Sequence, residues 1–185
     1  MKPGTRLLYP ALLLPTIFLA ACMPDLRSEH PPQRIYWLEA VEVPAVSAGD
    51  VQVSVVPGLD TDRIRILQKD RRLNYYAGAY WSGNLGTLLE SLLARSLNAD
   101  QEGPVVEVLV ERFFAVESGE GIPPDIELGA RIRLMRDAGG ELRCAFDSRS
   151  AAGGTRLRDI VAGHQARIDE LTRAIARMLE SGDCA

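Results

Sequence analysis

Residues 105–116 read VVEVLVERFFAV, residues 125–135 read DIELGARIRLM, and residues 141–147 read ELRCAFD. Successive side chains of a strand point to opposite faces, so this alternation predicts three strands with one buried and one solvated face. The residues expected on the buried face are Val106, Val108, Val110, Phe114, Val116, Ile126, Leu128, Ala130, Ile132, Leu134, Leu142, Cys144 and Phe146. The turn residues between the three runs predict an antiparallel meander.

Two segments outside these strands carry apolar residues at helical spacing. At 85–98 and 155–179 the apolar positions recur three and four residues apart, which predicts two amphipathic helices, the first with Asn84 as its N-cap. Further strands are expected at 34–43, 50–56, 64–68 and 72–77, the last two as a hairpin. The sequence therefore predicts an α+β fold in two layers, a largely antiparallel sheet with two main helices packed on one face.

The N-terminus has the layout of a bacterial export signal. Two basic residues precede an apolar run at 7–19, which is too short for a membrane-spanning helix of about 20 apolar residues. The run ends in LAAC at 19–22, which matches the lipobox of lipoprotein signal peptidase. We expect cleavage between Ala21 and Cys22, with a covalent diacylglycerol and an acyl chain on Cys22. The alternative is an ordinary signal peptide with an accidental cysteine.

This layout divides the chain into three segments. We expect the signal peptide at 1–21, the lipidated N-terminus and tether at 22–34, and a single periplasmic domain at 35–185. Met23, rather than aspartate, follows the lipidated cysteine. This favours the outer membrane, with the protein on its inner leaflet facing the periplasm.

Two further cysteines remain after the lipidated one, Cys144 and Cys184. In an oxidising compartment an even pair predicts one disulfide, which would stabilise the domain by about 3–4 kcal/mol. The alternative is two unpaired thiols.

Several functional classes find little support in the sequence. The formal net charge is −4 and there is no basic cluster, so a nucleic-acid partner is not expected. His30 lies in the tether and His164 on the buried stripe of the second helix, and neither has neighbouring metal ligands. No nucleophile elbow or phosphate-binding glycine loop is present. We therefore expect no enzyme, no catalytic residue, no metal and no cofactor apart from the lipid on Cys22.

The central block carries a specific resemblance. Residues 57–63 read PGLDTDR and residues 75–81 read YYAGAYW, and a leucine-rich helix follows. With the lipobox, this block resembles the ABC-type transport auxiliary lipoproteins (the PqiC/YmbA-like family) over residues 35–180. The chain departs from its relatives at 82–84, SGN, just after the tryptophan.

The resemblance implies a non-catalytic accessory subunit of an MCE-type system that moves lipids between the inner and outer membranes. The implied partners are an MCE-domain protein and its ABC permease and ATPase, and a homo-oligomer stays open. Aromatic residues dominate interface hot spots, so the candidates for partner contact are Tyr75, Tyr76, Tyr80 and Trp81. The competing interpretation places about half of these side chains in the core.

Two other functional classes would each need a feature of their own. A lipid- or lipopolysaccharide-binding assembly lipoprotein would need an apolar cavity between the helices and the sheet. A cell-envelope enzyme would need a cluster of reactive polar groups. Asp60 and Asp62 are interpreted as turn-capping residues that pair with Arg63, rather than as ligands.

Overall fold

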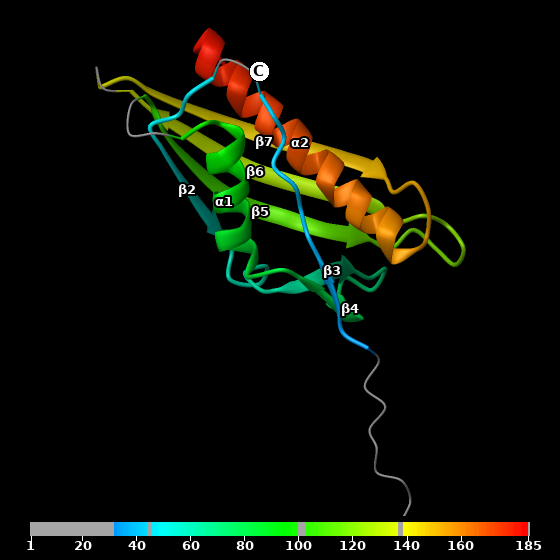
Figure 1. Ribbon diagram of the computed structural model, residues 1–185. Coiled ribbons are helices and arrows are strands. Elements are labelled where there is room, and N and C mark those ends of the chain that lie inside the picture. The colour runs from blue at the N-terminus through cyan, green and yellow to red at the C-terminus, as the bar shows by residue number, and fades with distance from the viewer. Residues whose placement is uncertain (1–31, 44–45, 100–102, 137–138, 185) are drawn as a thin grey trace, which may run out of the picture.

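The computed structural model describes residues 32–43, 46–99, 103–136 and 139–184. The predicted signal peptide, Cys22 and most of the predicted tether lie outside these residues. The described chain forms a seven-stranded sheet with two helices on one face, so the predicted α+β fold is confirmed (Figure 1). The elements in chain order are β1 (Arg34–Tyr36), β2 (Asp50–Val55), β3 (Arg63–Leu67), β4 (Leu73–Trp81), α1 (Leu85–Ser96), β5 (Val105–Val116), β6 (Asp125–Met135), β7 (Glu141–Ala151) and α2 (Leu157–Ser181).

The sheet is mixed. The strand order is β1-β4-β3-β5-β6-β7, and the pairs β3–β4, β5–β6 and β6–β7 are antiparallel, as expected for a hairpin and a meander. The pairs β1–β4, β2–β5 and β3–β5 are parallel, which the sequence did not predict. Because β6 occupies one edge of β5, β2 and β3 lie end to end along its other edge.

A β-bulge in β5 changes which residues are buried. The register of β5 against β6 shifts between Val110 and Arg112. Beyond this shift Phe113 and Ala115 are buried, whereas Phe114 and Val116 are only partly buried. The prediction that Phe114 and Val116 lie on the buried face is therefore wrong, because an extra residue inverts the alternation.

The first predicted strand is much shorter in the structure. β1 ends at Tyr36, and the chain from there to 43 runs between the two helices (Figure 1). Its backbone pairs with helix side chains, since the Glu39 N–H donates to Gln165 Oε1 at 2.8 Å and the Val41 N–H donates to Ser96 Oγ at 3.0 Å. Extended backbone that bonds to side chains in this way forms no strand ladder.

Each helix begins and ends within two residues of its predicted bounds. Asn84 occupies the N-cap position of α1, but its side chain makes no capping hydrogen bond. In α2, a Cβ added at Gly163 would lie 2.7 Å from Ile126 Cγ1, so this glycine lets the helix lie close to β6.

The space between helices and sheet is filled by side chains. The largest fully buried ones are Phe113, Ile64, Leu85, Leu89, Leu92, Leu93, Leu97, Ile126, Leu128, Ile132, Leu134 and Ile160.

Candidate functional site

The PGLDTD stretch of the central block connects β2 to β3 along the edge of β5. The Val56 N–H donates to the Val110 carbonyl at 3.1 Å, at the point where the β5 register shifts. Leu59 in the middle of the stretch is buried in the core. The stretch is therefore a structural crossover beside the bulge.

The same stretch also holds the start of α1 and the end of β4. Asp60 Oδ1 accepts from the Gly86 N–H at 3.3 Å, and the Asp62 carbonyl accepts from the Trp81 N–H at 2.6 Å. Asp60 therefore caps the first turn of α1, rather than the turn in which it lies. The expected pairing of these aspartates with Arg63 is wrong, because Arg63 forms no ion pair with a described residue.

Arg63 packs between two tyrosines. Its guanidinium carbon lies 4.3 Å from the centre of the Tyr75 ring and 5.3 Å from that of Tyr80. The three side chains lie on the face of the sheet that the helices leave open. The sequence analysis did not predict that Arg63 stacks on tyrosine rings. The alternation of side chains along the β3–β4 hairpin was the available signal, because it places Arg63 and Tyr80 on the same face.

The four aromatic candidates for partner contact divide between core and surface. Trp81 is 3% exposed, so its assignment to a contact surface is wrong. Tyr76 is partly buried, and burial, with a smaller effect of Glu117, raises its pKa to about 12. Tyr75 is 44% exposed and Tyr80 is partly exposed, so these two stay available for contact.

Trp81 belongs to an aromatic cluster around His164 on α2. The ring centres of Trp81 and His164 lie 5.3 Å apart in a T-shaped arrangement, and those of Phe113 and His164 lie 4.5 Å apart. His164 is fully buried, and neither ring nitrogen has a hydrogen-bond partner among the described residues. Burial alone lowers its pKa to about 3, so the imidazole is neutral at pH 7.

This histidine makes stability depend on pH. Its pKa is about 6.5 in the unfolded chain and about 3 in the folded protein, so between these values the unfolded state binds the additional proton. Its contribution to stability is complete above pH 6.5 and is lost as the pH falls towards 3. From pH 7 to pH 5 we expect a loss of about 2 kcal/mol in the free energy of unfolding. Urea denaturation at each pH measures it.

The matched variant is His164→Leu, which keeps an apolar group of similar size in the cluster. Titrating carboxylates contribute equally to both proteins, so the difference between the two pH profiles isolates His164. Parallel profiles would contradict the burial of a neutral histidine.

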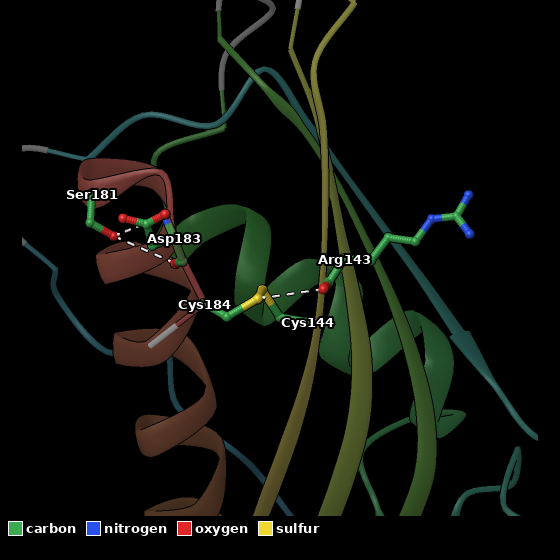
Figure 2. The surroundings of a disulfide bond; sticks show 5 residues. All are labelled: Arg143, Cys144, Ser181, Asp183 and Cys184. Atoms are coloured by element: carbon green, nitrogen blue, oxygen red, sulfur yellow. Dashed lines mark hydrogen bonds between the residues drawn. A yellow bond between two sulfur atoms is a disulfide. The ribbon is translucent and has the colours of Figure 1, made fainter.

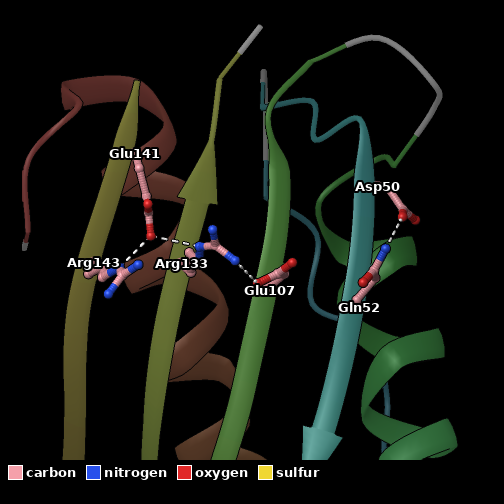
Figure 3. A network of polar contacts seen from close by, with 6 residues as sticks. All are labelled: Asp50, Gln52, Glu107, Arg133, Glu141 and Arg143. Atoms are coloured by element: carbon pink, nitrogen blue, oxygen red, sulfur yellow. Dashed lines mark hydrogen bonds and ion pairs between the residues drawn. The ribbon is translucent and has the colours of Figure 1, made fainter. Parts of the chain in front are cut away.

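The open face of β5, β6 and β7 is the face that the alternation predicted to be solvated, and it carries a lattice of ion pairs (Figure 3). Arg133 contacts Glu107 at 3.0 Å and Glu141 at 2.7 Å, and Glu141 also pairs with Arg143. Hydrogen bonds from the side chains of Arg143 and Arg133 hold the pKa of Glu141 below its usual value. A shallow depression of about 450 Å³, floored by Leu109, lies among these arginines.

The lattice continues toward the other end of the three strands. Arg149 lies 2.7 Å from Asp125 and 2.8 Å from Glu127, and Arg112 pairs with Asp147 across Gly129. A Cβ at this glycine would collide with the Arg112 guanidinium. Each arginine named on this half of the open face therefore has a carboxylate partner.

Cys144 and Cys184 form a disulfide between β7 and the segment after α2 (Figure 2). Their sulfurs are 2.04 Å apart and their Cα atoms 5.5 Å apart. The Cys184 sulfur also lies 3.4 Å from the Arg143 carbonyl oxygen. Since a disulfide sulfur carries no proton, this is a contact without a donated hydrogen.

Within the described ranges, no group of three or more histidine, cysteine, aspartate or glutamate side chains is arranged to hold a metal ion. A search of those same ranges for a helix long and apolar enough to cross a membrane finds none.

The geometry defines a small α+β domain with a closed core and an open sheet face. Residues 29–176 match the model of the family described as ABC-type transport auxiliary lipoprotein component, so the chain belongs to this family. A search of curated proteins finds no match.

Two solved structures have a similar fold. One is the protein XCC0632 from Xanthomonas campestris, of the family DUF330, with a TM-score of 0.68 and 18% identity, over 80% of this chain and 96% of that one. The other is an uncharacterized protein with a TM-score of 0.66 and 14% identity, over 79% of this chain and 97% of that one. At these identities the likeness concerns the fold alone.

Proposed function

We propose that the protein is a non-catalytic accessory subunit of an MCE-type ABC system that transports lipids between the inner and outer membranes. The observation that carries the proposal is the family match over residues 29–176, because the family is one of transport auxiliary components. The resemblance of the central block to relatives of MCE systems supplies the finer assignment.

The geometry supports a binding role over a catalytic one. The fully buried histidine is enclosed by aromatic rings, and the carboxylates on the open face are neutralised by arginines. Catalytic acids and bases need a pKa suited to proton transfer and access to substrate. His164, with its pKa lowered to about 3 inside the core, meets neither requirement.

The second functional class, a lipoprotein that carries its own lipid ligand, fits the structure less well. It needs an apolar cavity between helices and sheet, whereas leucine, isoleucine and phenylalanine side chains fill this layer. The apolar-floored depression lies on the opposite, open face and is shallow.

The test of the transport role is a pull-down of the tagged full-length lipoprotein from detergent-solubilised envelopes, followed by mass spectrometry. We expect an MCE-domain protein and its ABC permease to be recovered. A second lipoprotein with the same tag is the control for nonspecific recovery. Recovery of outer-membrane assembly factors, or of lipid alone, would replace the proposal with the second class.

The proposed anchor is the lipidated Cys22 at the outer membrane. We expect Cys22→Ala to leave the precursor unprocessed, because the thiol that accepts the diacylglycerol is lost. Gel mobility reports processing, and sucrose-gradient fractionation reports location. Cys184→Ala is the control, since it removes a cysteine without touching the lipobox. A processed Cys22→Ala protein that still sediments with outer membrane would contradict the anchor.

A further inference from the structure

The open face of the sheet has two halves that differ in charge compensation. On β5–β7 arginines are matched by carboxylates, as Arg133 is by Glu107 and Glu141. The other half, formed by β3 and the β3–β4 turn, carries four basic side chains, Arg63, Arg65, Lys69 and Arg71. None of these four forms an ion pair with a described residue, although the whole chain is at −4. A local excess of positive charge therefore lies on a protein that is acidic overall.

Burial strengthens the contrast at one of these arginines. Arg65 Nε is buried and has no hydrogen-bond partner among the described residues. Arg167 also has an unpaired Nε, but its guanidinium pairs with Glu170 at 2.7 Å, and Arg65 has no such ion pair among the described residues. A guanidinium prefers carboxylate or phosphate oxygens as acceptors.

Four of the five exposed large hydrophobic side chains among the described residues lie on β1, just after it, or on β4. Trp37 is 74% exposed, Ile35 is 61% exposed, Tyr75 is 44% exposed and Leu73 is 38% exposed. Ile35 lies beside Tyr80 in the β1–β4 register, and Tyr80 lies across Arg63 from Tyr75. Ile35, Tyr80 and Tyr75 are therefore connected through Arg63. Together with Leu73 on β4 and Trp37, two residues after Ile35 in the chain, they are here named the β1–β4 patch.

The patch lies where the chain leads toward the proposed anchor. The described chain enters at β1, beside β4 and β3, whereas α2 ends at the opposite side of the domain (Figure 1). The chain between Cys22 and Arg34 spans at most about 40 Å when fully extended. This is close to the length of α2, about 37 Å for its 25 residues. The β1 end is therefore the part of the domain that the chain joins to the anchor, and the tether lets it reach the membrane surface.

We propose that the β1–β4 patch lies against the anionic phospholipid headgroups of the membrane that holds the anchor, with Trp37 and Tyr75 at the headgroup level. Tryptophan and tyrosine favour this level because their rings are apolar and their N–H or O–H groups are polar. Unpaired lysine and arginine side chains bind the headgroup phosphates. The proposal rests on the proposed anchoring at Cys22.

The test uses the native lipidated protein in vesicles of phosphatidylcholine with phosphatidylglycerol, a quarter of the lipid being brominated near the headgroup. The chain has two tryptophans, the exposed Trp37 and the buried Trp81, so Trp37→Phe leaves only the core reporter. We expect quenching of tryptophan emission in the wild type to exceed that in Trp37→Phe at least twofold. We expect it to fall toward the Trp37→Phe level in vesicles of phosphatidylcholine alone.

Charge reversal separates the patch from general attraction to the membrane. We expect the double variant Lys69→Glu with Arg71→Glu to show at most half of the quenching seen in the wild type. The matched control is Arg95→Glu with Arg177→Glu, two exposed cations near the ends of α1 and α2, which we expect to leave it unchanged. Equal loss in both pairs would overturn the proposal.

Flotation of the vesicles distinguishes the possible failures. A protein that floats with the vesicles but shows equal quenching in wild type and Trp37→Phe overturns the patch and leaves the proposed function intact. A protein that does not float overturns the anchor and the patch together. Benzoylphenylalanine at position 37 in intact envelopes should yield lipid adducts, and protein adducts in their place would assign the patch to a partner and overturn the proposal.

Discussion

Cys144→Ser lowers the free energy of unfolding by about 4 kcal/mol in our expectation. The bond closes a loop with a sequence separation of 40 residues, and in the chain-entropy model closing such a loop removes about this much free energy from the unfolded state. It ties the edge strand β7 to the segment that follows α2, so the helix stays on the sheet. For a protein of this size the melting temperature should fall by about 8–16 °C. Calorimetry measures the shift.

The control is the double variant Cys144→Ser with Cys184→Ser. It should lose as much stability as the single variant, since the bond rather than either side chain carries the effect. Reductant should lower the melting temperature of the wild type by the same amount and leave the double variant unchanged. A wild type insensitive to reductant under denaturing conditions would contradict the disulfide.

Trp81→Ala should cost about 3–5 kcal/mol, the usual range for emptying a buried tryptophan site. The side chain is 3% exposed and packs against His164 and Phe113, so its removal leaves a cavity between α2 and the sheet. Urea denaturation measures the loss.

Tyr75→Ala is the matched control, because it removes another aromatic from the same strand. Its ring is 44% exposed and its main described contact is the stacked Arg63, a pair that contributes about 0.5–1 kcal/mol. We expect a loss below about 1 kcal/mol. Similar losses in the two variants would contradict the assignment of Trp81 to the core and Tyr75 to the surface.

Much of the fold could be predicted because burial imposes a period on the sequence. The alternation in β6 and the helical stripe of α2 identified the elements and their buried sides. The same reasoning failed in β5, where Glu111 and Arg112 are both directed to the open face and the phenylalanine that follows turns inward. Two adjacent charged residues within an alternating run were the available signal of the bulge.

The parallel pairings and the aromatic assignments were harder to predict. The parallel pairs form where β2 and β3, which are distant from β5 in the sequence, meet its edge. The period of side chains within one segment does not indicate which other segment it pairs with. Within YYAGAYW, Gly78 has a φ of 67° and the β3–β4 register shifts, so strict alternation does not extend through the stretch. Tyr75 and Tyr80 share the open face, whereas Tyr76 packs against the core and Trp81 enters it.

The arrangement of β2 and β3 end to end along β5 has a consequence for the order of folding. The meander of β5, β6 and β7 and the helix that covers it are consecutive in sequence, so they can assemble through short loops. The parallel pairings of β2 and β3 with β5 join segments that are far apart in the chain, and such contacts form slowly. We infer that residues 105–181 condense first and present the edge of β5 as a template on which the earlier half of the chain is completed.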